Sequence, residues 1–192
     1  MKLRLVMEEK KETISVHTEG TPNPNALKFV FNKTFIEKGS HNFTSIENCK
    51  NSPLAEKLFK IAHVNEVFIG KDFITITKKQ DIPWENIYDQ ILHTIDDHLY
   101  KGEPIIINTH INNEKGKSEI EQKILDLLDN QIRPAVAADG GDIIFDSYED
   151  GILKLHLQGA CSSCPSSIMT LKAGIEGLLK KQIPELKEVI SI

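Results

Sequence analysis

The apolar and polar positions in the first hundred residues alternate in four short runs. Residues 14–19 alternate, and after the turn-rich segment TPNPN the run ALKFVFN alternates again, which predicts two strands around a proline–asparagine turn. Two further runs, VNEVFIG and DFITITK, are separated by Gly70, Lys71 and Asp72, which are residue types of a tight turn. The pattern therefore predicts a β-hairpin over residues 64–78.

Helical spacing appears twice in the same half. Ser52 and Pro53 are the residue types of an N-cap and a first helical position, and the apolar residues of LAEKLFKI after them share one face. A longer helix is predicted from about Pro83 to Tyr100, where apolar residues recur every three or four positions. These strands and helices together indicate a compact α+β domain.

The second half opens with another helix. Ser118 with Glu121 three residues later forms a capping box, and the apolar residues that follow recur on one helical face. Arg133 and Pro134 are expected to kink or restart this helix. The segment DGGD at 139–142 is expected to end it, because its two glycines supply the positive φ angles that helix termination favours.

After this segment, apolar residues recur at every second position, which is the spacing of a β-strand. Residues 143–158 alternate on both sides of the turn Glu149–Gly151, which predicts a β-hairpin with leucines on the inward face of its second strand. Pro165 begins a second long helix, and a final strand follows Pro184. The second half is therefore expected to be an α+β domain with the order helix, hairpin, helix, strand.

Between the halves, residues 103–117 are rich in glycine, proline and asparagine and show no helical period, which predicts a linker. Its segment Pro104–Ile107 is apolar enough to pack against a folded neighbour. The expected organisation is a domain over residues 1–102, this linker, and a second domain over residues 118–192.

The composition excludes several classes of protein. With 192 residues, of which 40% are hydrophobic and 27% charged, the chain is typical of a folded globular protein and not of a disordered or fibrous one. It has no long apolar run and no apolar secretion-signal core at its start, so we expect no membrane association and a bacterial cytoplasmic location, or an organelle after processing. No Lys/Arg cluster stands out, and the net charge of −5 arises within residues 103–192, so nucleic-acid binding is not expected.

The strongest chemical signal is GACSSCPSS at residues 159–167, between the end of a predicted strand and the start of a predicted helix. Its two thiols, Cys161 and Cys164, are three residues apart, so a tight turn can direct both toward one metal centre. A helix N-terminus lowers the pKa of nearby thiols through its dipole and free amide groups, which favours the metal-binding thiolate.

A CxxC pair alone fits metal or cluster binding, thiol redox chemistry or structural cysteines. Redox sites of the thioredoxin type usually carry a proline between the cysteines, whereas Pro165 follows the second thiol. A structural zinc site needs four protein ligands, but this half offers two cysteines and His156. Thiol–disulfide oxidoreduction is the alternative function, and a zinc-bridged interaction module is a third.

The shortage of ligands in one chain has a consequence for assembly. An iron–sulfur cluster commonly takes four thiolates, and two chains with one CxxC each would supply four. A symmetric pair would place the cluster on a two-fold axis, exposed enough to be given away. Cys49, the third cysteine, has no second thiol nearby in the sequence, so it is interpreted as an incidental thiol and a disulfide scaffold is not expected.

Three motifs of the second half, IRPAVAADGGD, LQGACSSCPSS and TLKAGIE, stand in the order found in the NifU C-terminal (Nfu) domain, and this half resembles that domain. In the first half, TPNPNALKF, SPLAEKLFKI and VFIGKDFITITK are similar to the Nfu N-terminal domain. The two resemblances together cover nearly the whole chain.

The resemblance implies an iron–sulfur scaffold or carrier, and not an enzyme, that holds a 4Fe-4S cluster between two chains, with a 2Fe-2S cluster as the other option. The cluster ligands of the family fall on Cys161 and Cys164. The implied partners are a second copy of the chain in a cluster-bound homodimer, upstream cluster-assembly proteins and apo iron–sulfur client proteins. The first domain is expected to modulate dimerisation or the choice of target.

Other conspicuous residues have simpler interpretations. Asp139 and Asp142 are expected to belong to a helix-ending turn and not to a cation site. The segment TPNPN is expected to be an ordinary turn in preference to a recognition loop. For Arg133 the sequence leaves two roles open, which are support of the adjoining loop and contact with a target.

Overall fold

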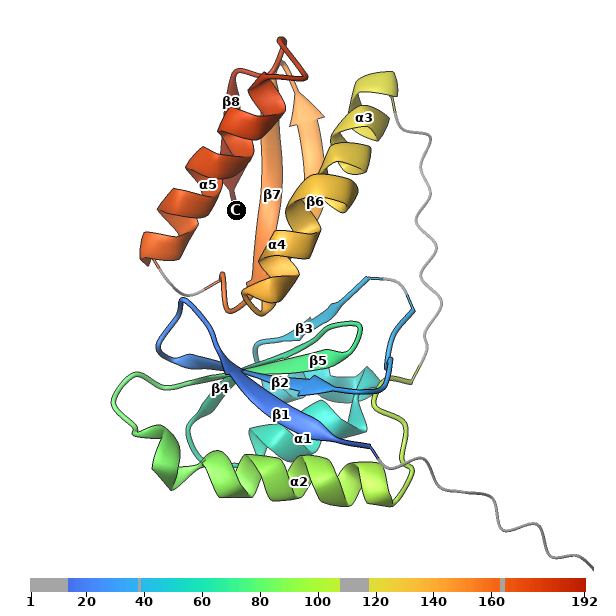
Figure 1. The fold of residues 1–192 in the computed structure, drawn as a ribbon, viewed down its shortest axis with the longest axis vertical. Helices are drawn as coiled ribbons and strands as arrows, with labels where there is room; N and C mark the ends of the chain where they lie inside the picture. The colour runs from blue at the N-terminus through green and yellow to red at the C-terminus, as the bar shows by residue number, and fades with distance from the viewer. Residues whose placement is uncertain (1–13, 38, 108–117, 163–164) are drawn as a thin grey trace, which may run out of the picture.

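The computed structural model describes residues 14–37, 39–107, 118–162 and 165–192, so Cys164 lies outside the described residues. These residues form two α+β parts, which Figure 1 shows one above the other. We call them the N-terminal unit (residues 14–107) and the C-terminal unit (residues 118–192). The α+β class expected for both halves is confirmed.

The N-terminal unit is built on a five-stranded sheet in which every neighbouring pair is antiparallel. Both predicted pairs of strands are present. The sequence did not predict the short edge strand β3 (His41–Phe43). In spatial order the strands are β1 (Val16–Gly20), β2 (Ala26–Phe31), β5 (Phe73–Lys78), β4 (Val64–Ile69) and β3 (His41–Phe43).

Two helices cover one face of this sheet (Figure 1). Helix α1 (Pro53–Phe59) begins where expected, because Ser52 caps it by accepting the Ala55 N–H at 3.1 Å and Pro53 occupies the first turn. The predicted helix from Pro83 divides into the 3-10 helix η2 (Trp84–Asn86) and α2 (Tyr88–Tyr100), because Ile87 lies between them at φ −128°. The 3-10 helix η1 (Ile46–Asn51) precedes α1.

The apolar core of the N-terminal unit lies between these helices and the sheet. Leu54 and Leu58 of α1 and Ile91 and Ile95 of α2 are almost fully buried against the sheet. The sheet contributes every second residue of its central strands, as an alternating pattern requires. These sheet residues include Phe29, Phe31, Val67, Ile69, Ile74 and Ile76.

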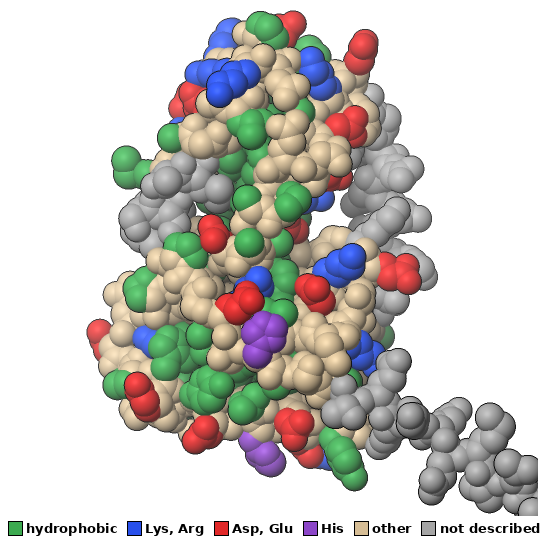
Figure 2. All heavy atoms as spheres, in the orientation of Figure 1, with side chains coloured by type: hydrophobic (Ala, Val, Ile, Leu, Met, Phe, Trp, Pro, Cys, Tyr) green, Lys and Arg blue, Asp and Glu red, His purple; other side chains and the backbone are tan. Residues whose placement is uncertain are grey.

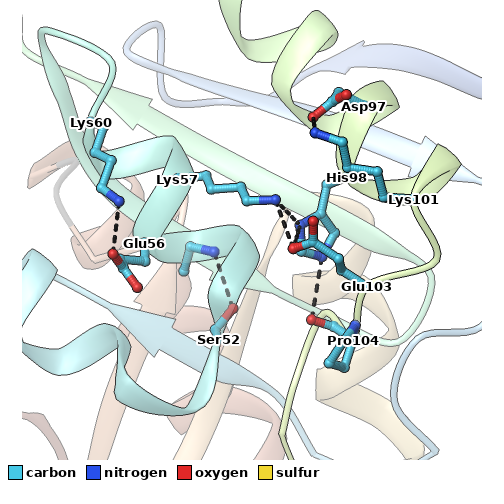
Figure 3. A network of polar contacts seen from close by, with 10 residues as sticks. Ser52, Glu56, Lys57, Lys60, Asp97, His98, Lys101, Glu103 and Pro104 are labelled. Carbon is cyan, nitrogen blue, oxygen red and sulfur yellow. Dashed lines mark hydrogen bonds and ion pairs between the residues drawn. The ribbon is translucent and has the colours of Figure 1, made fainter.

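The first residues of the predicted linker pack onto the N-terminal unit. Ser52 Oγ donates to the Ile105 carbonyl at 2.7 Å, the Ile107 N–H donates to the Asn51 carbonyl at 2.7 Å, and the Ile105 side chain is buried. Figure 3 shows the neighbouring polar network, in which His98 contacts the Pro104 carbonyl. The expectation that Pro104–Ile107 packs against a folded neighbour is confirmed.

The C-terminal unit has the predicted order of helix, hairpin, helix and strand. Its sheet is β6–β7–β8, with β6 and β7 antiparallel and β7 and β8 parallel. The elements are α3 (Glu119–Leu127), η3 (Leu128–Ile132), α4 (Arg133–Ala138), β6 (Gly141–Glu149), β7 (Ile152–Gly159), α5 (Pro165–Lys180) and β8 (Glu188–Ser191).

Local sequence signals account for the helical segment of this unit. The capping box forms, with Ser118 Oγ accepting the Glu121 N–H and Glu121 Oε2 accepting the Ser118 N–H at 2.7 Å. The segment η3 is a π-helical turn, closed by the Arg133 N–H on the Leu128 carbonyl. It precedes Pro134, which lacks the N–H that would continue the α-helical pattern. Gly140 at φ 83° follows the end of α4.

The second face of the N-terminal sheet is also covered. Lys28 of β2 pairs with Thr75 of β5, and Thr75 also pairs with Phe68 of β4. The three side chains therefore lie on one face of the sheet. This face is opposite to the one that carries Ile74 and Ile76. All six residues of β5 are nevertheless buried, because the end of the C-terminal unit that carries the β7–α5 turn rests on this face (Figure 1).

Among the described residues, none of the helices has the length and apolar character needed to cross a membrane.

Candidate functional site

The predicted cluster-binding segment begins where β7 ends. Gly159 pairs with Gly141 of β6 and adopts φ 67°, which turns the chain away from the sheet. A Cβ atom at Gly159 would lie 2.6 Å from the Gly140 carbonyl oxygen and 3.0 Å from the Cα of Gly141. The turn is closed by two backbone hydrogen bonds, from the Ala160 N–H to the Gly140 carbonyl and from the Ser162 N–H to the Gly159 carbonyl, each 3.1 Å long.

Cys161 lies in this turn with its side chain directed into the C-terminal unit. It is 5% exposed and belongs to the apolar core formed by α3, α4, β6, β7 and α5. Gly141 makes room for the sulfur, because a Cβ atom at Gly141 would lie 2.9 Å from Cys161 Sγ. The structure therefore places the first predicted ligand at the expected turn, but buried.

Cys164, the second predicted ligand, lies outside the described residues, so the pairing of the two thiols stays a prediction. The start of α5 at Pro165 agrees with the expected helix directly after the CxxC segment. Within the part of the chain that the structure describes, no group of three or more His, Cys, Asp or Glu side chains could hold a metal ion.

The N-terminal unit contacts this turn directly. Asn23 Nδ2 donates to the Ala160 carbonyl at 3.2 Å. The Ser162 hydroxyl lies 2.8 Å from Glu66 Oε2 and 3.0 Å from Glu66 Oε1. The Ala160 backbone and the Ser162 side chain, on the two sides of Cys161, are therefore contacted by side chains that come from more than ninety positions earlier in the chain.

The neighbouring glycine-rich segment after α4 is contacted in the same way. Lys28 Nζ donates to the Ala138 carbonyl at 3.2 Å, and Ser40 Oγ donates to Asp142 Oδ2 at 2.6 Å. A Cβ atom at Gly140 would lie 2.9 Å from Thr75 Oγ1, so Gly140 permits the close approach of the two units. Asp142 thus takes part in an interdomain hydrogen bond, a role that the sequence analysis did not foresee.

Glu66 is a buried carboxyl group at this junction, with 4% of its surface exposed. Burial raises the pKa of Glu66, while hydrogen bonds from Ser162, Asn42 and the Gly159 N–H oppose that rise. Sequence reasoning missed both Glu66 and Asn23. The signal for Glu66 was a lone carboxylate inside the apolar strand VNEVFI, and Asn23 was hidden in a segment whose composition is that of a turn.

Arg133 joins α4 to β6. Its Nη1 lies 2.8 Å from Asp129 Oδ1, and its Nε donates to the Ile143 carbonyl at 3.1 Å and lies 3.5 Å from Asp142 Oδ1. The sequence left two roles open for Arg133, support of the adjoining loop and contact with a target. These contacts favour support of the loop. Arg133 also lines a cleft of about 470 Å³ between the two units, together with Ser40, Phe68, Lys71 and Asp142.

Cys49 lies in the core of the N-terminal unit. It is 2% exposed, and its thiol donates to the Ser45 carbonyl at 3.3 Å. Burial raises the pKa of Cys49 to about 11, and the carboxylates of Glu56 and Glu47 add to this effect. A thiol in this state is a poor nucleophile and a poor metal ligand, in agreement with its interpretation as incidental.

Two α+β units with a CxxC segment between a strand and a helix of the second unit fit a metal-binding scaffold. The model of the family described as scaffold protein Nfu/NifU N terminal matches residues 16–102, and that of the NifU-like domain matches residues 124–190. The chain therefore belongs to the Nfu/NifU family of iron–sulfur cluster scaffold proteins.

Curated relatives agree with this assignment. The human protein named "NFU1 iron-sulfur cluster scaffold homolog, mitochondrial" is 43% identical over 178 residues, which cover 91% of this chain and 70% of the relative. The protein of the same name from Drosophila willistoni is 42% identical over 184 residues, covering 93% of this chain and 64% of the relative. The chain thus spans about two thirds of the length of these relatives.

Among solved structures, a NifU-like protein from Saccharomyces cerevisiae is 28% identical and has a TM-score of 0.47; the match covers 56% of this chain and 97% of that protein. The expectation that the protein is a scaffold and not an enzyme is confirmed by the family to which the chain belongs.

Proposed function

We propose that this protein binds a 4Fe-4S cluster through Cys161 and Cys164, shares it with the same two cysteines of a second copy, and delivers it to apo-proteins. The observation that carries the proposal is the position of the CxxC segment, between the turn at Gly159 that ends β7 and the start of α5. Two thiolates per chain are half of the set that a cluster commonly takes, so two copies complete it.

The local structure supports this role chemically. The turn at Gly159 carries the chain from β7 directly to the N-terminus of α5, which spans sixteen residues. The dipole and free N–H groups of a helix N-terminus stabilise negative charge, and the two proposed ligands directly precede such a helix in the sequence. Transfer then needs no bond-making catalysis, because a thiolate of the recipient replaces Cys161 or Cys164 at iron one ligand at a time.

The proposed function also includes the division into domains, the partner proteins and the cellular location. Residues 1–102 and 118–192 are proposed to be the two domains, joined by 103–117, of which the first residues pack on the N-terminal unit. The proposed partners are upstream assembly proteins that supply the cluster and apo iron–sulfur clients that receive it. The names of the relatives favour a mitochondrial location over the bacterial cytoplasm that the sequence alone suggested.

Anaerobic reconstitution with iron and sulfide tests the proposal. We expect about four irons per dimer, a doubling of the mass measured by light scattering, and loss of both in Cys161→Ser and in Cys164→Ser. Cys49→Ser is the matched control and is expected to load like the unmodified chain, because Cys49 lies in the core of the N-terminal unit. A cluster-loaded monomer would contradict the shared ligand set.

The alternatives give different results in the same preparation. A thiol–disulfide oxidoreductase would reduce insulin disulfides and develop no iron-dependent absorbance. A zinc-bridged module would copurify with zinc and separate or unfold on chelation. Either result, together with failure to bind iron, would replace the proposed function.

A further inference from the structure

The face that the N-terminal sheet turns toward the CxxC turn is more polar than its other face. It carries Lys28, Glu66, Thr75 and Thr77 together with the aromatic residues Phe68 and Phe73, all of them less than 9% exposed in the structure. Burying polar groups contributes little net stabilisation compared with burying apolar ones. The contact between the two units therefore mixes polar and apolar groups, as is typical of contacts between units that can separate, unlike the apolar core on the other face of the same sheet.

The contacts of this face converge on one end of the C-terminal unit. Thr75 approaches Gly140, Phe68 approaches Gly159, Asn23 holds the Ala160 carbonyl and Glu66 holds the Ser162 hydroxyl. Gly159, Ala160 and Ser162 flank Cys161 in the sequence, and Gly140 lies beside them because its carbonyl accepts the Ala160 N–H. Figure 2 shows the described atoms narrowing where the two units meet.

A cluster shared by two chains requires the CxxC turn to be accessible to a second chain. Two CxxC turns from two chains must approach one another closely enough for their sulfur atoms to bind the same iron–sulfur core. The N-terminal unit occupies the side of the turn formed by Ala160 and Ser162. These contacts hold the turn in the conformation in which the Cys161 side chain packs into the core of the C-terminal unit. A second chain cannot reach a turn that is covered in this way.

We propose that the N-terminal unit is an internal cap, which covers the CxxC turn in the cluster-free chain and must move away before a second copy can share a cluster. This inference rests on the proposed function, since it concerns access to the same turn. The cap holds the cluster-free chain as a monomer with the Cys161 thiol protected, and the hydrogen bonds of Asn23 and Glu66 to the turn set how often the cap opens.

The chain offers a matched pair of substitutions for the test. Asn23→Asp keeps the Oδ1 that accepts the Asn25 N–H at 3.0 Å, but replaces the donor to the Ala160 carbonyl by an oxygen that repels it. Asn25→Asp introduces the same charge two residues away, where the side chain accepts from Lys78 Nζ at 3.0 Å. Only the first change touches the cap contact.

The measurement is the rate at which iodoacetamide alkylates Cys161 in the full-length, cluster-free chain, followed by peptide mass spectrometry. Asn23→Asp is expected to raise this rate about tenfold, the effect of losing one buried hydrogen bond and adding a repulsion. Asn25→Asp is expected to leave it unchanged. Equal rates in Asn23→Asp and Asn25→Asp would overturn the inference.

A second pair of substitutions tests the cap by introducing a long, charged side chain. Thr75→Lys introduces a long side chain where Gly140 lies close to the sheet, on the face away from Ile74 and Ile76, and is expected to open the cap further. Thr94→Lys, on α2, is the control, since the Thr94 hydroxyl contacts only its own helix, at the Gln90 carbonyl, in the described structure.

Cys49 reports unfolding in every variant, because it is buried in the core of the N-terminal unit. Faster labelling of Cys161 with Cys49 still protected supports the cap, whereas equal gains at both cysteines would assign the exposure to unfolding and overturn it. Alkylation needs no cluster, so its result is independent of reconstitution. Failure of every variant to bind iron would defeat the proposed function, and loading without any change in alkylation would defeat the cap alone.

Discussion

Ser162, the residue after Cys161, places its hydroxyl 2.8 Å from the carboxylate of Glu66, which lies 96 positions earlier in the sequence. The pair joins the turn of the C-terminal unit to strand β4 of the N-terminal unit. A buried carboxylate is therefore part of the surface that covers the proposed cluster site. Its ionisation gives the first of four predictions.

Glu66 should make the folded chain less stable as pH rises. Burial raises the pKa of this carboxyl group above its ordinary value of 4.5, so the folded state favours the protonated form. Its contribution to stability is greatest below pH 4.5 and is lost as pH rises through the higher folded pKa. Urea unfolding at several pH values should show the unmodified chain losing stability relative to Glu66→Gln over this range. A pH-independent difference between the two would contradict the assignment.

His98 should have the opposite pH dependence. It is fully buried, with Nε2 3.3 Å from the Pro104 carbonyl and Nδ1 3.3 Å from Lys57 Nζ (Figure 3). This arrangement suits a neutral ring that donates to Pro104 and accepts from Lys57. Burial, reinforced by the charge of Lys57, lowers the pKa of His98 below 6.5. Stability is therefore full above pH 6.5 and decreases as pH falls through the folded pKa.

The substitution His98→Gln tests this assignment, because a glutamine can donate to Pro104 and accept from Lys57 without titrating. We expect the stability of the unmodified chain to fall relative to His98→Gln between pH 7.5 and pH 5. His93→Gln, at an exposed position of the same helix, is the control and should follow the unmodified chain. Parallel curves for the unmodified chain and His98→Gln would show that the ring does not titrate in this range.

The capping box of α3 should contribute measurably to the C-terminal unit. Ser118→Ala removes the oxygen that accepts the Glu121 N–H, and loss of such a cap destabilises a protein by about 1 kcal/mol. The change should appear as a lower urea midpoint with an unchanged slope. Ser147→Ala, whose hydroxyl contacts the adjacent Asp146 at an exposed position, should have a much smaller effect.

Thr75→Val should strengthen the contact between the units. Thr75 Oγ1 is buried and has no hydrogen-bond partner among the described residues, and a valine of similar shape removes that polar atom. We expect up to about 1 kcal/mol of stabilisation and slower alkylation of Cys161. Thr94→Val is the comparison, because it removes a hydroxyl that does form a hydrogen bond. Faster alkylation in Thr75→Val would show that the hydroxyl favours the covered state.

Local signals in the sequence predicted most elements correctly. The glycines that end β7 and α4, the capping box at Ser118 and the alternation of β5 each depend on residues that are close in sequence. Short elements without a strong period were missed, as β3 and η1 show. The helix predicted from Pro83 was too long at its start, because apolar spacing alone does not distinguish a 3-10 turn from an α-helix.

The contact between the units was beyond the reach of these signals. In FITITK the alternation separates Ile74 and Ile76 from Thr75 and Thr77, and a polar face normally indicates solvent. The structure buries both faces, because a segment more than sixty positions later in the chain rests on the threonines. For the same reason the sequence placed Cys161 at a turn after β7, as the structure does, but gave no sign that this turn is in contact with the N-terminal unit.

The hydrogen bonds that hold Ile105 and Ile107 on the N-terminal unit also affect how this unit competes with a second chain for the turn that carries Cys161. They place residue 107 on the N-terminal unit, and residues 108–117 separate it in the sequence from Ser118. Two units joined through so few positions of one chain meet at an effective concentration in the millimolar range, whereas a second copy in solution is normally far more dilute. Under the proposed function, the N-terminal unit of the same chain would outcompete a second chain until the binding energy of a shared cluster favours the dimer.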